Sequence, residues 1–241
     1  TLELPTDRPR PSTLSHRGDQ VHWQLTDATA ARLRAIGAAA GCSPFMVFVA
    51  VYAMLLARYA RTEDLVIGTP VAGRPQSALE HVIGLFVNML PLRADLSGNP
   101  LFGELLERVR RTTLDAFAHQ DLPFEQLIEA LQPARDRSRS PVFQAAFILH
   151  NAPTPGTDAL VDAAGQLGEP VQVAHANSKF DLTLGMWETQ HALGGSFEFC
   201  SDLFHDRHDT FFLSLFSEDR HDHHLNGCQS RRHHQPLGIA M

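Results

Sequence analysis

Residues 45–60, FMVFVAVYAMLLARYA, constrain the fold of this chain more than any other stretch. They are apolar almost all the way round a helix, so such a helix must be buried on most of its sides. Ser43 and Pro44 precede them, and these residue types suit an N-cap and a first helical position. The apolar run 44–57 is shorter than a membrane span and leads into arginines. We therefore predict the core helix of a globular domain and no membrane association.

Composition narrows the class of protein further. The chain has 241 residues, of which 44% are hydrophobic and 20% charged, enough for one large domain or two small ones. Its net charge of -7 argues against wrapping nucleic acid. The three cysteines are far apart and form neither a disulfide framework nor a CxxC metal site. With no signal peptide in TLELPTDRPRPS, we expect reduced thiols in a cytoplasmic protein.

Hydrophobic periodicity predicts a mixture of helices and strands. Helices are expected at 26–40, 44–60 and 100–119, and a short one from Pro123. Short apolar runs predict strands at 64–74, 86–96, 142–150, 180–188 and 194–201. Pro91 places the second of these at an edge, a bulge or a strand end. This pattern predicts an α/β sandwich with a mixed sheet.

A series of short motifs follows in a fixed order: GTPVAGR (68–74), IGLFVNMLPLR (83–93), HQDLPFEQLIEAL (119–131), RDRSRSPVFQAAF (135–147) and SKFDLTL (178–184). Together they closely resemble the later motifs of condensation domains from nonribosomal peptide synthetases. The opening LPTDRPRP is similar to the linker between the two lobes of that domain. The resemblance covers residues 1 to about 204.

Membership of that family implies a fold like chloramphenicol acetyltransferase, with two lobes around a tunnel. It also implies that an acyl or peptidyl thioester is joined to the amine of an aminoacyl thioester. Both substrates ride on phosphopantetheine arms of carrier proteins, and no cofactor is bound by the domain itself. The implied partners are peptidyl and aminoacyl carrier proteins, the N-terminal condensation lobe and neighbouring synthetase domains.

The family's catalytic motif, HHxxxDG, belongs to the first lobe and is missing here. His223-His224 and His233-His234 both lack the Asp-Gly that should follow. The chain thus resembles the second lobe alone, and we expect no catalytic residue in it and little activity in isolation. The alternatives are a catalytically inactive remnant or a module that docks carrier proteins. An epimerisation domain, which shares the fold, matches RDRSRSPVF and HQDLPFE less well.

We divide the chain into an inter-lobe linker (1–20), the C-terminal lobe (21–204) and an atypical tail (205–241). A chain that opens in a linker is expected to be part of something longer. Half of the 14 histidines fall in the tail, which keeps no periodic pattern after DTFFLSLF. The abrupt change of composition favours a frameshifted or spliced-on end. The histidine spacing matches no zinc motif, so we predict no metal site.

Two residues are candidates for support of the tunnel. Asn88 puts an amide inside an apolar run, where it either faces the tunnel or satisfies backbone groups near Pro91. Arg74 follows a strand on a loop that, by resemblance, forms the tunnel floor. Its guanidinium is expected to pair with the Asp of HHxxxDG from the other lobe, which would leave it unpaired in the isolated lobe.

Three further charged groups have structural interpretations. Arg135, Asp136 and Arg139 are expected to form a salt-bridged turn that anchors the strand after them. Lys179 and Asp181 share a face of a strand by the period of two, which predicts an ion pair or a backbone anchor. His119 is expected to end the helix 100–119, where a positive charge meets the favourable end of the helix dipole.

Overall fold

The computed structural model describes residues 1–74, 76–79, 81–150, 177–188 and 193–205. Its centre is a mixed six-stranded sheet with the strand order β1-β6-β5-β4-β2-β3. The strands are β1 (Gly18–Leu25), β2 (Asp64–Val71), β3 (Asn88–Asp95), β4 (Ala145–His150), β5 (Leu182–Glu188) and β6 (Leu193–Cys200). β2, β4 and β5 run parallel to one another, and the other pairings are antiparallel.

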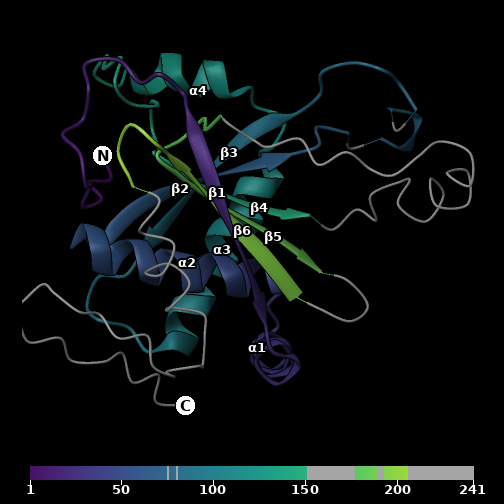
Figure 1. Ribbon diagram of the computed structural model, residues 1–241. Helices are drawn as coiled ribbons and strands as arrows, with labels where there is room; N and C mark the ends of the chain where they lie inside the picture. Colours follow the sequence, from purple (N-terminus) through teal and green to yellow (C-terminus); the bar gives the residue numbers. More distant parts are fainter. Residues whose placement is uncertain (75, 80, 151–176, 189–192, 206–241) are drawn as a thin grey trace, which may run out of the picture.

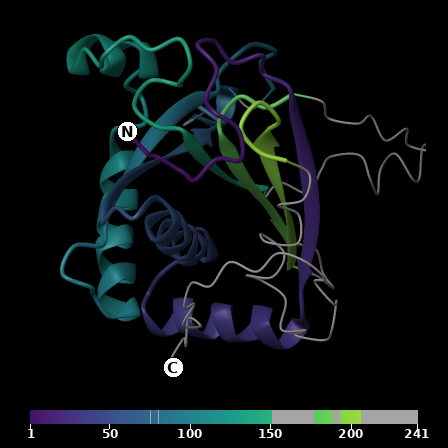
Figure 2. The ribbon, with the colours of Figure 1, turned by 60° about the vertical axis from the view of Figure 1, so that its left-hand side comes forward.

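The predicted helices are all present: α1 (Asp27–Ala39), α2 (Pro44–Ala60), α3 (Phe102–Ala118) and α4 (Phe124–Leu131). The Thr26 side chain caps α1 and the Ser43 side chain caps α2, as their sequences indicate. Figures 1 and 2 show α1, α2 and α3 gathered on one side of the sheet, with α4 at its upper end. The predicted α/β sandwich with a mixed sheet is therefore confirmed.

The core lies between α2 and the sheet. Ala50, Tyr52 and Ala53 of α2 are completely buried, and so are Phe147 and Phe197 of the strands beneath. The Tyr52 ring lies 6.3 Å from that of Phe147, and its hydroxyl donates to the Leu182 carbonyl. Burial raises the pKa of the Tyr52 hydroxyl, which stays a neutral donor.

Two strand predictions need correction. β3 begins only at Asn88, so Phe86 and Val87, which the apolar run placed in the strand, lie in the loop before it. β3 is an edge strand and carries Pro91, as predicted. β1 was not predicted, because its sequence GDQVHWQL is mostly polar and only Trp23 and Leu25 are buried.

The first 17 residues form a strap across the end of the sheet where β4 and β5 begin. Leu2 and Leu14 are buried in the core, and the Leu2 amide donates to the Gln144 side chain at 2.7 Å. Arg10 makes a two-pronged contact with the carboxylate of Asp181, which is 1% exposed, and also donates to the Ser138 carbonyl. The strap is thus packed into this domain, while its place between two lobes stays a prediction.

Of the two alternatives for Lys179 and Asp181, the ion pair between them was wrong. Lys179 is exposed and Asp181 is buried, because both precede β5 rather than alternating along it. Asp181 forms its ion pair with Arg10 instead, 171 residues away in the chain.

Within the described residues, no single helix is long and apolar enough to cross a membrane. Only α1 and α2 together have the length and the composition, and the pair is bent by 106°.

We predict that Asp181→Ala lowers the free energy of unfolding by about 3 kcal/mol, since the Arg10 side chain, only 14% exposed, loses the buried carboxylate that pairs with it. Urea denaturation of the whole chain measures this. Asp64→Ala is the matched control, because Asp64 pairs with Arg93 at 2.8 Å with both side chains exposed. It should cost at most about 1 kcal/mol. Equal losses in the two variants would show that the Arg10 contact does not hold the strap.

Candidate functional site

Arg74 and Asn88, the two residues predicted to support the tunnel, lie at one end of the sheet. At this end β3 begins and β2, β4 and β5 finish, and we call it the Asn88 end. Val71, the last residue of β2, pairs with Asn88, the first of β3. α2 and α4 begin at this end, and α3 finishes there. Ligands of α/β sheets bind outside the carboxyl ends of the strands, so this is the end at which a site is expected.

Arg74 lies on the loop that leaves β2. Its guanidinium is 4.1 Å from the centre of the Phe86 ring and also donates to the Leu79 carbonyl. Gly73 has a positive φ of 62°, and a Cβ there would lie 1.9 Å from the Phe86 carbonyl oxygen. The start of the loop, at Gly73 and Arg74, is therefore packed against its last part, at Phe86, and we call this contact the base of the loop. The expectation of an unpaired Arg74 was wrong, because contacts within the loop engage it.

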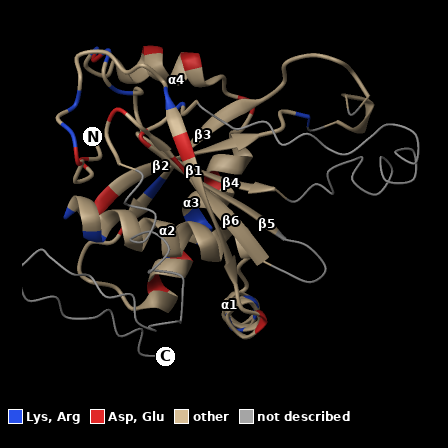
Figure 3. Ribbon diagram, in the orientation of Figure 1, with Lys and Arg blue, Asp and Glu red and all other residues tan. Residues whose placement is uncertain are grey.

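Beyond this base the loop exposes large apolar side chains. Ile83 is 100% exposed, Leu85 93% and Val87 58%; with Val82 they form what we call the apolar arm (82–87). Figure 3 shows the loop mostly in the colour of uncharged residues, and Arg74 is the one charged residue in the part of the loop that is described. Exposed apolar clusters of this kind are common at interaction surfaces.

Asn88 has a structural role, but with other partners than those predicted. Its amide nitrogen donates to the carbonyls of Gln120 and Leu122 at 2.9 and 2.8 Å. Its amide oxygen accepts the Phe124 N–H at 3.0 Å, at the first residue of α4. The Asn88 side chain thus holds the turn between α3 and α4. It also caps α4, because Pro123, the N-cap residue of that helix, has no side chain that can accept a hydrogen bond.

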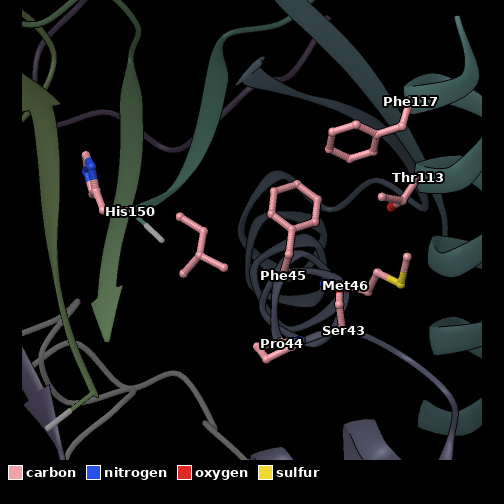
Figure 4. A pocket seen from close by; sticks show the side chains of 8 residues that line it. Ser43, Pro44, Phe45, Met46, Thr113, Phe117 and His150 are labelled. Carbon is pink, nitrogen blue, oxygen red and sulfur yellow. Dashed lines mark hydrogen bonds between the residues drawn. The ribbon is translucent and has the colours of Figure 1, made fainter. Parts of the chain in front are cut away.

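A cavity of about 360 Å³ opens between the first turn of α2, the last turns of α3 and the end of β4. Figure 4 shows Phe45 at its centre, Phe117 and Thr113 on the α3 side and Met46 beside them. Leu149 lines it from β4, whereas the ring of the next residue, His150, points away from Phe45. The lining is thus mostly apolar, with His150 at its edge.

Arg135 and Asp136 lie at the opposite end of the sheet, so the four predicted residues do not form one site. Asp136 accepts from the Ser138 amide and hydroxyl at 2.8 and 2.7 Å, and these bonds lower the pKa of its carboxyl. Arg139 contacts Asp136 at 3.4 Å and Glu3 at 2.9 Å. The salt-bridged turn is therefore present, but Arg135 is exposed and joins none of the ion pairs in the described ranges.

His119 ends α3, as predicted, and its ring nitrogen contacts the Asp115 carbonyl at 2.8 Å.

The cavity between α2, α3 and β4 was not predicted from the sequence. Phe45 and Phe117 were assigned to the apolar faces of their helices, which is also where a cavity lining lies. The one available signal was Thr113, a polar residue among the apolar positions of the helix 100–119. The histidine-rich tail lies outside the described residues beyond His205.

Comparison with known proteins identifies the family. The sequence model described as "Condensation domain" matches residues 1–218, which is most of the chain. This chain belongs to the condensation-domain family. Malpinin synthetase of Mortierella alpina is 42% identical over 205 residues, and the dimodular nonribosomal peptide synthase of Bacillus subtilis is 42% identical over 213. Each match covers 84% of this chain but only 3% and 9% of those proteins.

A solved structure confirms the fold and shows how much of a related protein this chain covers. The X-domain from teicoplanin biosynthesis superposes with a TM-score of 0.75 at 30% identity, covering 89% of this chain and 48% of that one. This chain thus spans about half of that X-domain chain and under a tenth of the two curated synthetases. The family match also runs past Phe204 into the segment assigned to the atypical tail, whose boundary stays a prediction.

We predict that Asn88→Ala lowers the free energy of unfolding by about 2 kcal/mol, because two carbonyls and the Phe124 N–H lose their partner. Chemical denaturation measures the loss, and amide hydrogen exchange should speed up at Phe124. Gln120→Ala is the control, since only the Gln120 backbone carbonyl takes part, and it should stay within about 0.5 kcal/mol. Unchanged exchange at Phe124 in the Asn88 variant would contradict the assigned role.

Proposed function

We propose that this chain is the acceptor-side half of a nonribosomal peptide synthetase condensation domain. In that role it supplies one wall and the floor of the tunnel in which an amide bond forms. The observation that carries the proposal is the apolar arm at the Asn88 end, a surface that is unfavourable in water and suited to contact with a second lobe. The coverage of about half of a related domain and the absence of HHxxxDG from the sequence both support it.

Arg74 fits the role of a contact to the catalytic lobe. A guanidinium has five N–H donors, and among the described residues one hydrogen bond, from one of its nitrogens to the Leu79 carbonyl, engages it. The remaining edge can receive the Asp of HHxxxDG in a two-pronged pair. The Phe86 ring beneath it keeps the guanidinium plane in place for that contact. Arg74 would then be a positioning residue that holds the catalytic loop in shape.

The chemistry follows from the family. The amine of an aminoacyl thioester attacks the carbonyl of an acyl or peptidyl thioester, the C–N bond forms, and the donor thiol leaves as the amine loses a proton. The His of the other lobe acts as base, or positions the amine and stabilises the oxyanion. Carrier proteins with phosphopantetheine arms deliver both substrates. This chain contributes walls and orientation rather than a group that reacts.

Reconstitution tests the proposal. The full chain is mixed with a separately expressed HHxxxDG lobe of a condensation domain, and amide formation between two loaded carrier proteins is followed by mass spectrometry. We expect no product from this chain alone and product from the pair. Turnover by the chain alone would contradict the proposal. Binding of carrier proteins without binding of the lobe would favour the docking-module alternative, and neither binding would favour an inactive remnant.

The apolar arm gives the mutational test. Ile83→Ser combined with Leu85→Ser should weaken association of the two lobes at least tenfold, since each buried aliphatic side chain contributes roughly 1.5–3 kcal/mol. Leu101→Ser is the matched control, because Leu101 is 75% exposed but lies at the opposite end of the sheet. The arm variant should melt like the wild type, and Leu101→Ser should melt no lower, because Leu101 is the N-cap of α3 and serine suits that position. Equal affinity in the arm variant would exclude the arm from the interface.

A further inference from the structure

The face of the sheet that is turned away from α2 carries polar side chains near the Asn88 end. Phe147 and Phe197 are buried beneath α2, so His150 of β4 and Ser196 of β6, an odd number of positions away, alternate onto the opposite face. Figure 4 shows the His150 ring directed away from Phe45 of α2. His150 is exposed and Ser196 half-buried, and neither side chain has a hydrogen bond or an ion pair to another described residue. Both can therefore contact a ligand that approaches this face.

Gly185 of β5 lies between these two side chains. It pairs with Ser196 on one side and with Ile148 on the other. A Cβ on Gly185 would lie 3.4 Å from Ser196 Oγ, 3.8 Å from His150 Nε2 and 3.9 Å from the Ser196 carbonyl oxygen, its three nearest neighbours outside the adjoining chain. A hydroxyl, a neutral imidazole and a carbonyl all accept hydrogen bonds. Three acceptors thus surround one point of the sheet, and we call Gly185, Ser196 and His150 the Gly185 site.

Three acceptors around one point fit a primary ammonium group, which has three N–H donors and no acceptor. The charge on this face agrees with such a ligand. β1, β4, β5 and β6 contain no Lys or Arg, whereas Glu198, two residues from Ser196, alternates onto the same face and is half-buried. A carboxylate would be repelled by the Ser196 carbonyl and the Glu198 charge, with no cation on these strands to offset them.

We infer that the Gly185 site binds the ammonium group of the acceptor aminoacyl thioester and that His150 accepts the proton which this group must lose. The binding of an ammonium rests on the geometry alone, whereas its assignment to the acceptor rests on the proposed function. His150 is the last residue of β4, so the site lies at the Asn88 end, where the proposal places the tunnel. His150 would add a proton acceptor to the walls that the proposal assigns to this chain.

The proton transfer comes before the formation of the amide. α-Amino groups titrate at about pH 7.7–8.0, so at neutral pH most of the acceptor arrives as an ammonium, which has no lone pair for attack. One N–H proton passes to His150 Nε2, and the freed lone pair attacks the thioester carbonyl. As the C–N bond forms and the C–S bond breaks, a second proton leaves the nitrogen for the His of the other lobe and passes to the departing thiolate. The imidazolium of His150 then returns its proton to water.

Probes that differ in one group test the binding on the full chain without any catalysis. Alaninamide carries a primary ammonium at pH 6.5, N-acetylalaninamide carries none and acetate carries the opposite charge. An NMR titration should show a saturable shift of the His150 ring signal with alaninamide, the signal being assigned by its loss in His150→Gln. The other two probes should bind at least about tenfold more weakly. Equal binding of acetate, or no binding of alaninamide, would overturn the site.

Gly185→Ala should block the site without disturbing the strand. Gly185 is not among the glycines with a positive φ, and the new Cβ would meet its neighbours at ordinary contact distances. The variant should therefore be at least as stable as the wild type, yet bind alaninamide about tenfold more weakly. Gly103→Ala on α3 is the matched control, because a Cβ there meets nothing within 4 Å. Unchanged binding in Gly185→Ala would overturn the placement of the ammonium.

The role of His150 in proton transfer is tested by pH in the reconstituted pair of lobes. His150→Gln keeps a polar side chain of similar size that cannot take the proton. Its kcat/KM should stay within about threefold of the wild type at pH 8.5, where most of the acceptor is a free amine, and fall about tenfold below it at pH 6.5. His22→Gln is the matched control, since His22 alternates onto the same face but its ring lies 5.9 Å from that of Trp187. It should match the wild type at both pH values.

A ratio of variant to wild type that does not change with pH would overturn the role of His150. The other titratable side chains that alternate onto this face are His22, Glu198 and Cys200 and, at the far end of β2 and β3, Asp64, Arg93 and Asp95. All of them are present in His150→Gln, so its pH dependence reports on His150. Failure of the wild-type pair to turn over any acceptor would instead overturn the proposed function, and the probe titrations would still decide whether the Gly185 site binds an ammonium.

Discussion

The burial of α2 against the sheet is the contact on which the rest of the structure depends. Ala50 and Ala53 present small side chains, so the helix approaches the strands closely, and Tyr52 and Leu56 fill the space beside them. Because α2 is apolar on nearly every side, α1 and α3 must cover the faces that the sheet leaves open. Its first turn, fixed by Ser43, also places Phe45 at the centre of the cavity. The same helix therefore forms the core and one wall of the site.

The two ends of the sheet are chemically different. At the end where β4 and β5 begin, the strap is held by charged and polar contacts from Arg10, Asp181 and Gln144. At the Asn88 end, the apolar arm is exposed, and Arg74 and Asn88 hold the neighbouring loops in place. Charged contacts with a buried member are costly to leave unpaired, so they suit a permanent attachment within the chain. Exposed apolar side chains suit an interface that forms when a second protein surface covers them.

All the elements except β1 were predictable from the sequence because their signals are local. The caps of α1 and α2, the edge position of β3 and the apolar face of α3 each depend on residues within a few positions of one another. The site depended on contacts that no local pattern contains. Asn88 binds groups 32 to 36 residues away, and Arg10 binds Asp181 across 171 residues. Sequence analysis singled out Asn88 and Asp181 as unusual, and Asn88 does satisfy backbone groups, but these lie far from Pro91, and the ion pair of Asp181 is with Arg10 rather than Lys179.

The construction of the loop after β2 explains how so apolar a surface can serve recognition. A free loop would pay for its own ordering when a partner bound, which lowers affinity for a given contact area. Here Gly73 brings the chain against the Phe86 backbone, and Arg74 covers the Phe86 ring, so the base is closed before any partner arrives. Asn88 then holds the next strand to the start of α4. The apolar arm therefore begins and ends on fixed points, and less ordering remains to be done at the interface.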